Sequence, residues 1–288
     1  MKEKVIVILG PTAIGKSSLA VKIAHLYNGE VISADSRQVY KYLDIGTGKI
    51  SPKEMNGIPH YGLDLVSPKK TYSVVLYQKY ALKKIKDILK RGKTPIICGG
   101  TGFYIDAVTQ NLILPTVPAN LILRKELNKN STEENYKILV SLDKERANNI
   151  DAKNNVRLIR AIEIAKVLGK VPSLAVEPPS ESKYEFIKIG LTLPQEDLYK
   201  NIEKRVKIMF KSGLLSEIET LKKMKISTDK LREFGFEYFN PTLESVTSGS
   251  KKYAKRQVTW FKRDKEINWF EPKNLKEIKK LINQKLKS

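Results

Sequence analysis

The chain has 288 residues and a formal net charge of +22, which favours a polyanionic partner such as a nucleic acid; a lysine-rich surface without such a partner is the alternative. Its single cysteine, Cys98, lies in an apolar run typical of a core and excludes an internal disulfide. No apolar run approaches the roughly 18 residues of a membrane span, and the N-terminus lacks a signal-peptide pattern. We expect a soluble, cytoplasmic monomer with no membrane contact.

The first predicted strand, Val5–Leu9, leads into a glycine-rich segment and then a helix over Gly15–Tyr27. This order is the P-loop pattern, in which backbone N–H groups and the helix dipole bind phosphate oxygens. The lysine of the pattern reaches the outer phosphate and the serine hydroxyl binds Mg²⁺. An unliganded glycine-rich turn is the alternative. The predicted phosphate-binding residues are Gly10, Pro11, Thr12, Ala13, Ile14, Gly15, Lys16 and Ser17, with Ser17 as the metal ligand.

A second strand, Gly29–Ala34, ends on Asp35, at the edge where parallel sheets bind their ligands. The third strand, Thr94–Cys98, ends in Gly99-Gly100 instead of the second carboxylate that a nucleoside triphosphatase needs for Mg²⁺ and water. Hydrolysis as the main activity is therefore disfavoured. A small-molecule kinase and a transferase that releases diphosphate both stay open, and Asp35 could act as a base in either. A helix cap or a structural ion pair is its alternative role.

The rest of the chain divides into α/β and helical parts. Leu121–Leu168 has the pattern of successive helices, and a strand pattern returns at Glu185–Leu193. We predict an α/β fold with a P-loop-type parallel sheet and helices on both faces, formed by residues 1–114 and 184–288, with an inserted all-helical domain over 115–183. Further predicted elements are a loop or short helix at Ser36–Tyr40, an ordered loop at Asp44–Lys49, helices at Tyr72–Arg91, Phe103–Val108, Leu198–Phe210, Leu214–Met224 and Tyr253–Phe261, an apolar stretch at Ile267–Phe270 and a Lys-rich final helix.

Six motifs, in order along nearly the whole chain, resemble those of the tRNA dimethylallyltransferase (tRNA isopentenyltransferase) family. Any one of them alone is a weak to moderate signal, whereas six in order are highly specific. They are GPTAIGKS at Gly10–Ser17, ISADSRQVY at Ile32–Tyr40, DIGTGK at Asp44–Lys49, GGTGFY at Gly99–Tyr104, NNVRLIRAIE at Asn154–Glu163 and YAKRQVTWFKR at Tyr253–Arg263.

The resemblance implies transfer of the dimethylallyl group of dimethylallyl diphosphate to N6 of the adenosine 3′ to the anticodon of tRNA, with Mg²⁺. It implies that the P-loop holds a diphosphate, not ATP. Asp35 matches the family's general base, which takes the proton of the exocyclic amine. Thr12, Lys16 and Arg205 would hold the departing diphosphate, and Ser17 would bind Mg²⁺.

The resemblance also implies contacts with tRNA, whose target base is flipped into the site because N6 is inaccessible in a stacked loop. Arg157 and Arg160 are three residues apart and would share one helical face; a solvated helix face is the alternative. Two departures from the family pattern are Asn201, where the family has arginine, and Phe236, where it has tyrosine. The implied tRNA-contacting residues are Asp35, Ser36, Arg37, Gln38, Thr101, Arg124, Val156, Arg157, Leu158, Ile159, Arg160, Lys255, Arg256 and Gln257.

Three other functions compete with this interpretation. An adenylate isopentenyltransferase acts on free AMP, ADP or ATP and needs neither the insertion nor a basic tail. The helical block and the basic tail, with 13 basic and 4 acidic side chains from Lys251 onward, therefore argue against this function. A P-loop small-molecule kinase would bind ATP tightly and turn it over. A nucleic-acid-binding module without catalysis would leave both Asp35 and the P-loop unexplained.

Overall fold

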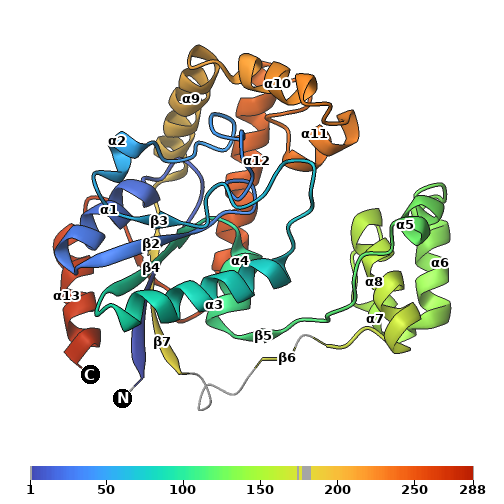
Figure 1. The fold of residues 1–288 in the computed structure, drawn as a ribbon, viewed down its shortest axis with the longest axis horizontal. Helices are drawn as coiled ribbons and strands as arrows, with labels where there is room; N and C mark the ends of the chain where they lie inside the picture. The colour runs from blue at the N-terminus through green and yellow to red at the C-terminus, as the bar shows by residue number, and fades with distance from the viewer. Residues whose placement is uncertain (1, 174, 177–182, 288) are drawn as a thin grey trace. The chain divides into compact units, whose positions relative to one another are not determined.

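The computed structural model describes residues 2–173, 175–176 and 183–287. Within them, a parallel sheet has the strand order β3-β2-β4-β1-β7-β8 (Figure 1). The predicted α/β class with a P-loop-type parallel sheet is confirmed. The strands are β1 (Glu3–Leu9), β2 (Gly29–Ala34), β3 (His60–Tyr61), β4 (Thr94–Gly99), β7 (Tyr184–Leu191) and β8 (Asn268–Phe270).

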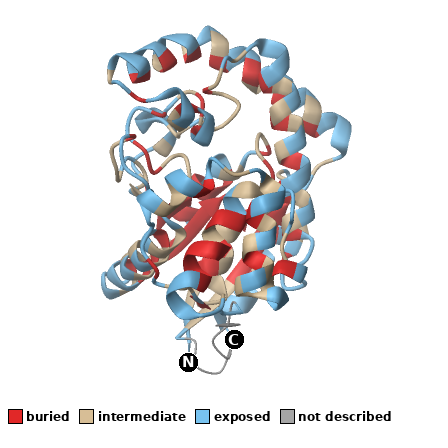
Figure 2. Cartoon of the chain, turned by 90° about the vertical axis from the view of Figure 1, so that its right-hand side faces the viewer, coloured by how far each residue is buried: buried red, intermediate tan, exposed pale blue. Residues whose placement is uncertain are grey.

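Side chains of β1 alternate between two cores, as the pleat of a strand requires. Val5, Val7 and Leu9 pack in one cluster with the helix that precedes β4, whereas Ile6 and Ile8 pack in the other with the helix that follows the P-loop. The central strands β1, β2 and β4 are accordingly buried on both faces (Figure 2). This double burial explains why β1 is a continuous apolar run instead of an alternating one.

Helices cover both faces of this sheet, and those predicted from the sequence are confirmed. The helix predicted at Tyr253 begins earlier, at Leu243, where Thr242 accepts a hydrogen bond from the Ser245 N–H in a capping box. Two short helices, α2 and α11, were not predicted. The helices are α1 (Lys16–Leu26), α2 (Pro52–Met55), α3 (Val74–Lys90), α4 (Gly102–Thr109), α9 (Gln195–Lys211), α10 (Leu214–Lys223), α11 (Thr228–Phe234), α12 (Leu243–Phe261) and α13 (Leu275–Lys287).

The chain forms two compact units: Met1–Asn111 with Pro178–Ser288, which we call the core unit, and Leu112–Glu177, which we call the inserted unit. Of the block 115–183 predicted as an insertion, residues 174 and 177–182 lie outside the described residues. The elements of the inserted unit are helices α5 (Leu121–Leu127), α6 (Thr132–Leu142), α7 (Lys144–Asn148) and α8 (Asn155–Leu168), with an antiparallel pair, β5 (Leu112–Ile113) and β6 (Ala175–Val176).

The inserted unit has its own small core. Leu139 from α6 and Leu158 and Ile162 from α8 are fully buried in it. Separately, among the described residues no helix is long and apolar enough to cross a membrane.

Candidate active site

The P-loop connects β1 to α1. Gly15 precedes α1 in a left-handed conformation with φ of +92°, and the helix begins at Lys16. Ser17 is exposed in the first turn, and its hydroxyl has no hydrogen-bond partner among the described residues. The helix therefore presents the free N–H groups of its first turn and a free hydroxyl, which together suit an anion and a metal ion.

Two cations lie close to this loop. The Lys16 ammonium donates to the Pro11 carbonyl oxygen at 2.7 Å, and the Arg205 guanidinium donates to the Thr47 carbonyl oxygen at 3.0 Å. Neither side chain forms an ion pair with a described acidic residue. Burial lowers the pKa of Lys16 to about 8, and the nearby charge of Arg205 lowers it further. Burial also lowers the pKa of Arg205. An anion placed between them would relieve both effects.

Asp35 lies at the carboxyl end of β2, and its charge acts on both Lys16 and Arg205. One carboxylate oxygen, Oδ1, accepts hydrogen bonds from the backbone N–H groups of Arg37 at 2.8 Å and Gln38 at 3.3 Å. The capping role considered for Asp35 is thus fulfilled by Oδ1 alone. No described residue bonds Oδ2, which leaves one oxygen free to accept a proton.

Other predicted residues order the surroundings of Asp35. The Thr101 hydroxyl oxygen accepts from the Ser36 N–H at 3.0 Å. Gln257 from α12 is 5% exposed. Its amide accepts from the Thr12 N–H at 2.9 Å and donates to the Gly100 carbonyl at 2.8 Å. Gln257 thereby ties α12 to the P-loop, and its direct contact with tRNA stays a prediction.

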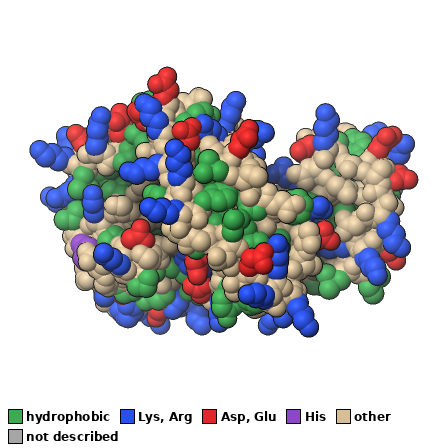
Figure 3. Space-filling model, turned by 90° about the horizontal axis from the view of Figure 1, so that it is seen from above, with side chains coloured by type: hydrophobic (Ala, Val, Ile, Leu, Met, Phe, Trp, Pro, Cys, Tyr) green, Lys and Arg blue, Asp and Glu red, His purple; other side chains and the backbone are tan. Residues whose placement is uncertain are grey.

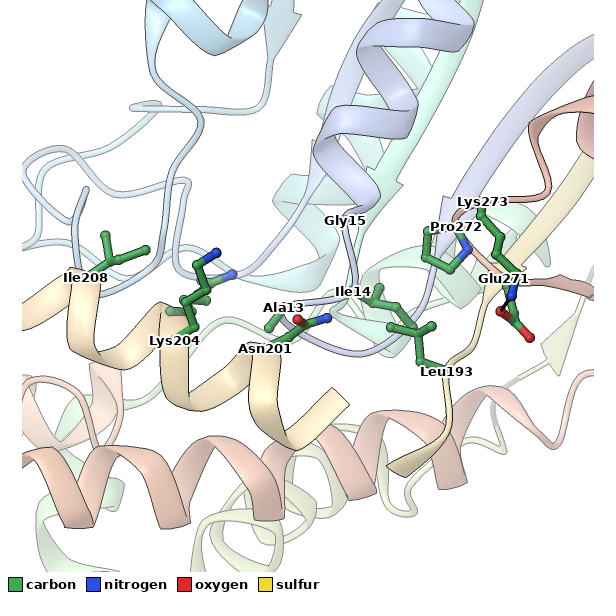
Figure 4. A pocket seen from close by; sticks show the side chains of 11 residues that line it. Ala13, Ile14, Gly15, Leu193, Asn201, Lys204, Ile208, Glu271, Pro272 and Lys273 are labelled. Carbon is green, nitrogen blue, oxygen red and sulfur yellow. Dashed lines mark ion pairs between the residues drawn. The ribbon is translucent and has the colours of Figure 1, made fainter. Parts of the chain in front are cut away.

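A pocket of about 510 Å³ opens beside the P-loop (Figure 4). The loop segment Ala13–Gly15 forms one wall, and α9 forms another. Asn201 lies on that wall. The remaining lining residues are Leu193, Lys204, Arg205, Ile208, Glu271, Pro272 and Lys273.

The inserted unit contains its own charged cluster, which we call the Arg–Glu–Arg cluster: Arg124, Glu163 and Arg160. Arg124 binds both carboxylate oxygens of Glu163, at 2.7 and 2.6 Å, and Arg160 binds one of them at 3.1 Å. Glu163 is 1% exposed, whereas each arginine side chain is 34% exposed. Burial raises the pKa of Glu163, but the hydrogen bonds from the arginines and the Asn120 N–H outweigh burial and lower it overall.

The remaining residues predicted to contact tRNA in this unit differ in exposure. Val156 is 79% exposed and Arg157 is also exposed, whereas Leu158 and Ile159 are buried in the core of the unit. Of these four residues, Val156 and Arg157 therefore have the accessible side chains. In the core unit, Lys255 and Arg256 are exposed on α12.

Comparisons with known proteins agree with this geometry. The model of the IPP transferase family matches residues 38–264, and that of the isopentenyl transferase family matches residues 3–68. The tRNA dimethylallyltransferases of Anoxybacillus flavithermus and Carboxydothermus hydrogenoformans are 40% and 39% identical to this chain, over 94% of its length and over 91% and 93% of theirs.

The chain belongs to the tRNA dimethylallyltransferase family.

Solved structures of related proteins agree with this assignment. The full-length tRNA isopentenylpyrophosphate transferase of Bacillus halodurans is 35% identical, with a TM-score of 0.71 over 99% of this chain and 97% of that one. A eukaryotic dimethylallyltransferase acting on tRNA is 26% identical, with a TM-score of 0.78 over 99% of this chain and 77% of that one. The protein is thus a transferase that modifies tRNA.

Sequence reasoning missed two residues of this dimethylallyltransferase that lie near Asp35. Burial raises the pKa of Glu237 to about 7 and that of Tyr253 to about 12, and both side chains interact electrostatically with Asp35 and Arg37. Tyr253 opens the motif YAKRQVTWFKR, so its position in a family motif was a usable signal. Glu237 lies outside the six quoted motifs, and the fold brings it to the site.

The net charge of the dimethylallyltransferase does not by itself locate a surface for tRNA. Figure 3 shows Lys and Arg side chains spread over the visible face, with Asp and Glu side chains among them. On this face the basic side chains do not form a single patch, so the total charge does not mark a binding surface.

Proposed function

We propose that the protein transfers the dimethylallyl group of dimethylallyl diphosphate to N6 of the adenosine 3′-adjacent to the anticodon of tRNA and releases diphosphate. The observation that carries this proposal is the pair of cations, Lys16 and Arg205, whose charges no described carboxylate neutralises and which both interact with Asp35. Such an arrangement suits a diphosphate on one side and a proton donor on the other.

Each residue has a defined part in the proposed reaction. The free oxygen of Asp35 accepts the proton of the N6 amine as the new C–N bond forms. The C–O bond of the donor breaks at the same carbon, and the electron pair leaves with the diphosphate. Lys16, Arg205 and the N–H groups of the P-loop stabilise the negative charge that develops on this leaving group. Backbone carbonyls hold both cations in place before the reaction, so little reorganisation is needed.

The donor set at the P-loop fits Mg²⁺. Among the described residues no group of three or more His, Cys, Asp or Glu side chains could enclose a metal ion, and the Ser17 hydroxyl is a single hard oxygen ligand. Mg²⁺ commonly binds through one or two protein ligands together with substrate phosphates and waters. When bound, it would supply further charge neutralisation for the diphosphate.

We also propose that the inserted unit contacts the anticodon arm of tRNA. Support comes from the exposed Val156 and Arg157 at the start of α8 and from the exposed edges of the two arginines in the Arg–Glu–Arg cluster. Contacts of arginine with phosphates position a nucleic acid and weaken as salt rises. We therefore expect tRNA affinity to fall steeply with ionic strength, and donor affinity to change much less.

The test is incubation of the purified protein with dimethylallyl diphosphate, Mg²⁺ and unmodified tRNA, followed by mass analysis of the nucleosides. We expect one dimethylallyl group on the adenosine next to the anticodon. Parallel reactions replace tRNA with AMP, ADP or ATP, or replace the donor with ATP. Modification of free adenylate would favour an adenylate isopentenyltransferase, and ATP turnover without a prenylated product would favour a kinase; either result would overturn the proposal.

A further inference from the structure

The motif DIGTGK, residues 44–49, is held by a residue far away in the sequence. Glu217 extends from α10, and its carboxylate accepts the backbone N–H groups of Asp44 at 2.8 Å, Ile45 at 2.7 Å and Gly46 at 3.0 Å. Tyr238, 1% exposed, donates its hydroxyl to the same carboxylate at 2.9 Å. One side chain thus satisfies three consecutive backbone donors, which a carboxylate does more strongly than a neutral acceptor.

The opposite side of this loop faces the proposed diphosphate site. The Thr47 carbonyl accepts from the Arg205 guanidinium at 3.0 Å and from the Gln38 amide at 3.5 Å. The Gly48 carbonyl accepts from the same amide at 3.4 Å. Loop 44–49 therefore connects Glu217 to Arg205 and to the turn that contains Asp35, without Glu217 itself touching the site.

The loop has little room to shift between these two anchors. A Cβ atom on Gly46 would lie 2.6 Å from the Tyr238 ring, and one on Gly48 would lie 2.2 Å from the Arg205 guanidinium. At the Glu217 end, Leu214 and Leu221 lie on the same face of α10 as Glu217, and both are buried. A displacement at Glu217 would consequently be passed to the Thr47 carbonyl.

We propose that Glu217 is a positioning residue for the transfer reaction: through loop 44–49 it holds the Thr47 carbonyl that orients the Arg205 guanidinium toward the departing diphosphate. This inference rests on the proposed function, in which Arg205 stabilises the leaving group. It also assigns a role to the backbone of the DIGTGK motif, whose N–H groups bind Glu217 and whose carbonyls bind Arg205 and Gln38.

The test is Glu217→Gln, which keeps the size of the side chain but turns an acceptor oxygen into an N–H₂ group that opposes the backbone donors. We expect kcat/KM for the donor to fall about tenfold, the size of effect of one lost charged hydrogen bond. The matched control is Glu219→Gln on the same helix, whose exposed side chain pairs only with Lys222 among the described residues; it should match the wild type.

A double-mutant cycle separates positioning from a general loss of folding. In an Arg205→Gln background, Glu217→Gln should lower kcat/KM for the donor by less than a further factor of about two, because the guanidinium that Glu217 positions is gone. Additive effects would overturn the proposal, and so would wild-type activity of Glu217→Gln. If that variant does not fold, Tyr238→Phe removes a single hydrogen bond to the same carboxylate and should show the same dependence on Arg205; independence would contradict the proposal.

A measurement of inorganic diphosphate binding distinguishes failure of this inference from failure of the proposed function. Calorimetry should detect binding to the wild type and weaker binding to Glu217→Gln. No binding to the wild type would count against the proposed function itself. Equal binding and equal turnover by both proteins would leave the proposed function intact and overturn the role of Glu217.

Discussion

The two units contain the same ingredients, two cations and a carboxylate, in opposite arrangements. In the inserted unit, Arg124 and Arg160 bind the carboxylate of Glu163 directly, at 2.6 to 3.1 Å. In the core unit, Lys16 and Arg205 donate to backbone carbonyls, and Asp35 accepts from backbone N–H groups.

The pKa values follow the same division. The guanidinium groups around Glu163 lower its pKa, whereas burial without a paired carboxylate lowers the pKa of both Lys16 and Arg205. Pairing with the two arginines compensates the burial of the Glu163 carboxylate in the inserted unit. Cations held near a carboxylate without being paired to it retain their charge for a ligand, at a cost in stability.

The largest effect is expected at the carboxylate of the core unit. Asp35→Asn keeps the acceptor that orders the turn but removes the base, so kcat should fall by about 10²–10⁴-fold. Donor binding should be almost unchanged. Steady-state kinetics with tRNA and calorimetry with the donor measure the two effects, and Asp87→Asn on the exposed side of α3 is the control. Activity within threefold of the wild type would exclude Asp35 as the base.

Removal of a core cation should have the next largest effect. Arg205→Gln should lower kcat/KM by about 10²-fold, because one fixed donor to a developing charge is lost. The melting temperature should hold or rise, since a buried cation without an ion pair is removed. A large drop in melting temperature with normal kinetics would mean that Arg205 has a structural role like that of Arg124.

The converse effect is expected in the Arg–Glu–Arg cluster. Glu163→Gln should destabilise the inserted unit by about 1.5–3 kcal/mol, the range for hydrogen bonds to charged groups. Limited proteolysis should then cut within 112–177 more readily, and diphosphate binding to the core unit should not change. This destabilisation should become smaller in acid, because the folded protein lowers the pKa of Glu163. The ionised carboxylate contributes its full stabilisation at pH values above its pKa in the unfolded chain. That stabilisation is lost as the pH falls through its pKa in the folded protein.

The smallest expected effect is a pH dependence that distinguishes the two kinds of cation. Lys16 has a pKa of about 8, so it is charged below that pH and neutral above it. Donor affinity should therefore weaken as pH rises above 8, by about fivefold between pH 8 and pH 9. Lys16→Arg should abolish this change, because a guanidinium stays charged. If donor affinity falls with pH in Lys16→Arg as it does in the wild type, a group other than Lys16 causes the change.

Local sequence patterns were sufficient for the parts of the site that neighbouring residues make. The P-loop follows from a strand, a glycine-rich turn and a helix in immediate succession, and Asp35 follows from its place after β2. The first half of α12 was not predictable in this way, because its sequence LESVTSGS has low helix propensity and is stabilised by the capping box at Thr242 and by burial of Val246.

Taken alone, the sequence determined the central strands, the P-loop and the place of Asp35 at the end of β2, because each depends on residues close together in the chain. Only the tertiary structure decided which charges are neutralised. Arg205 meets the Thr47 carbonyl across 158 positions and Gln257 meets the P-loop across 245. The sequence does not show whether an arginine will bind a carboxylate, as Arg124 does, or a backbone carbonyl, as Arg205 does. The difference arises because packing of distant segments selects the partner of each arginine.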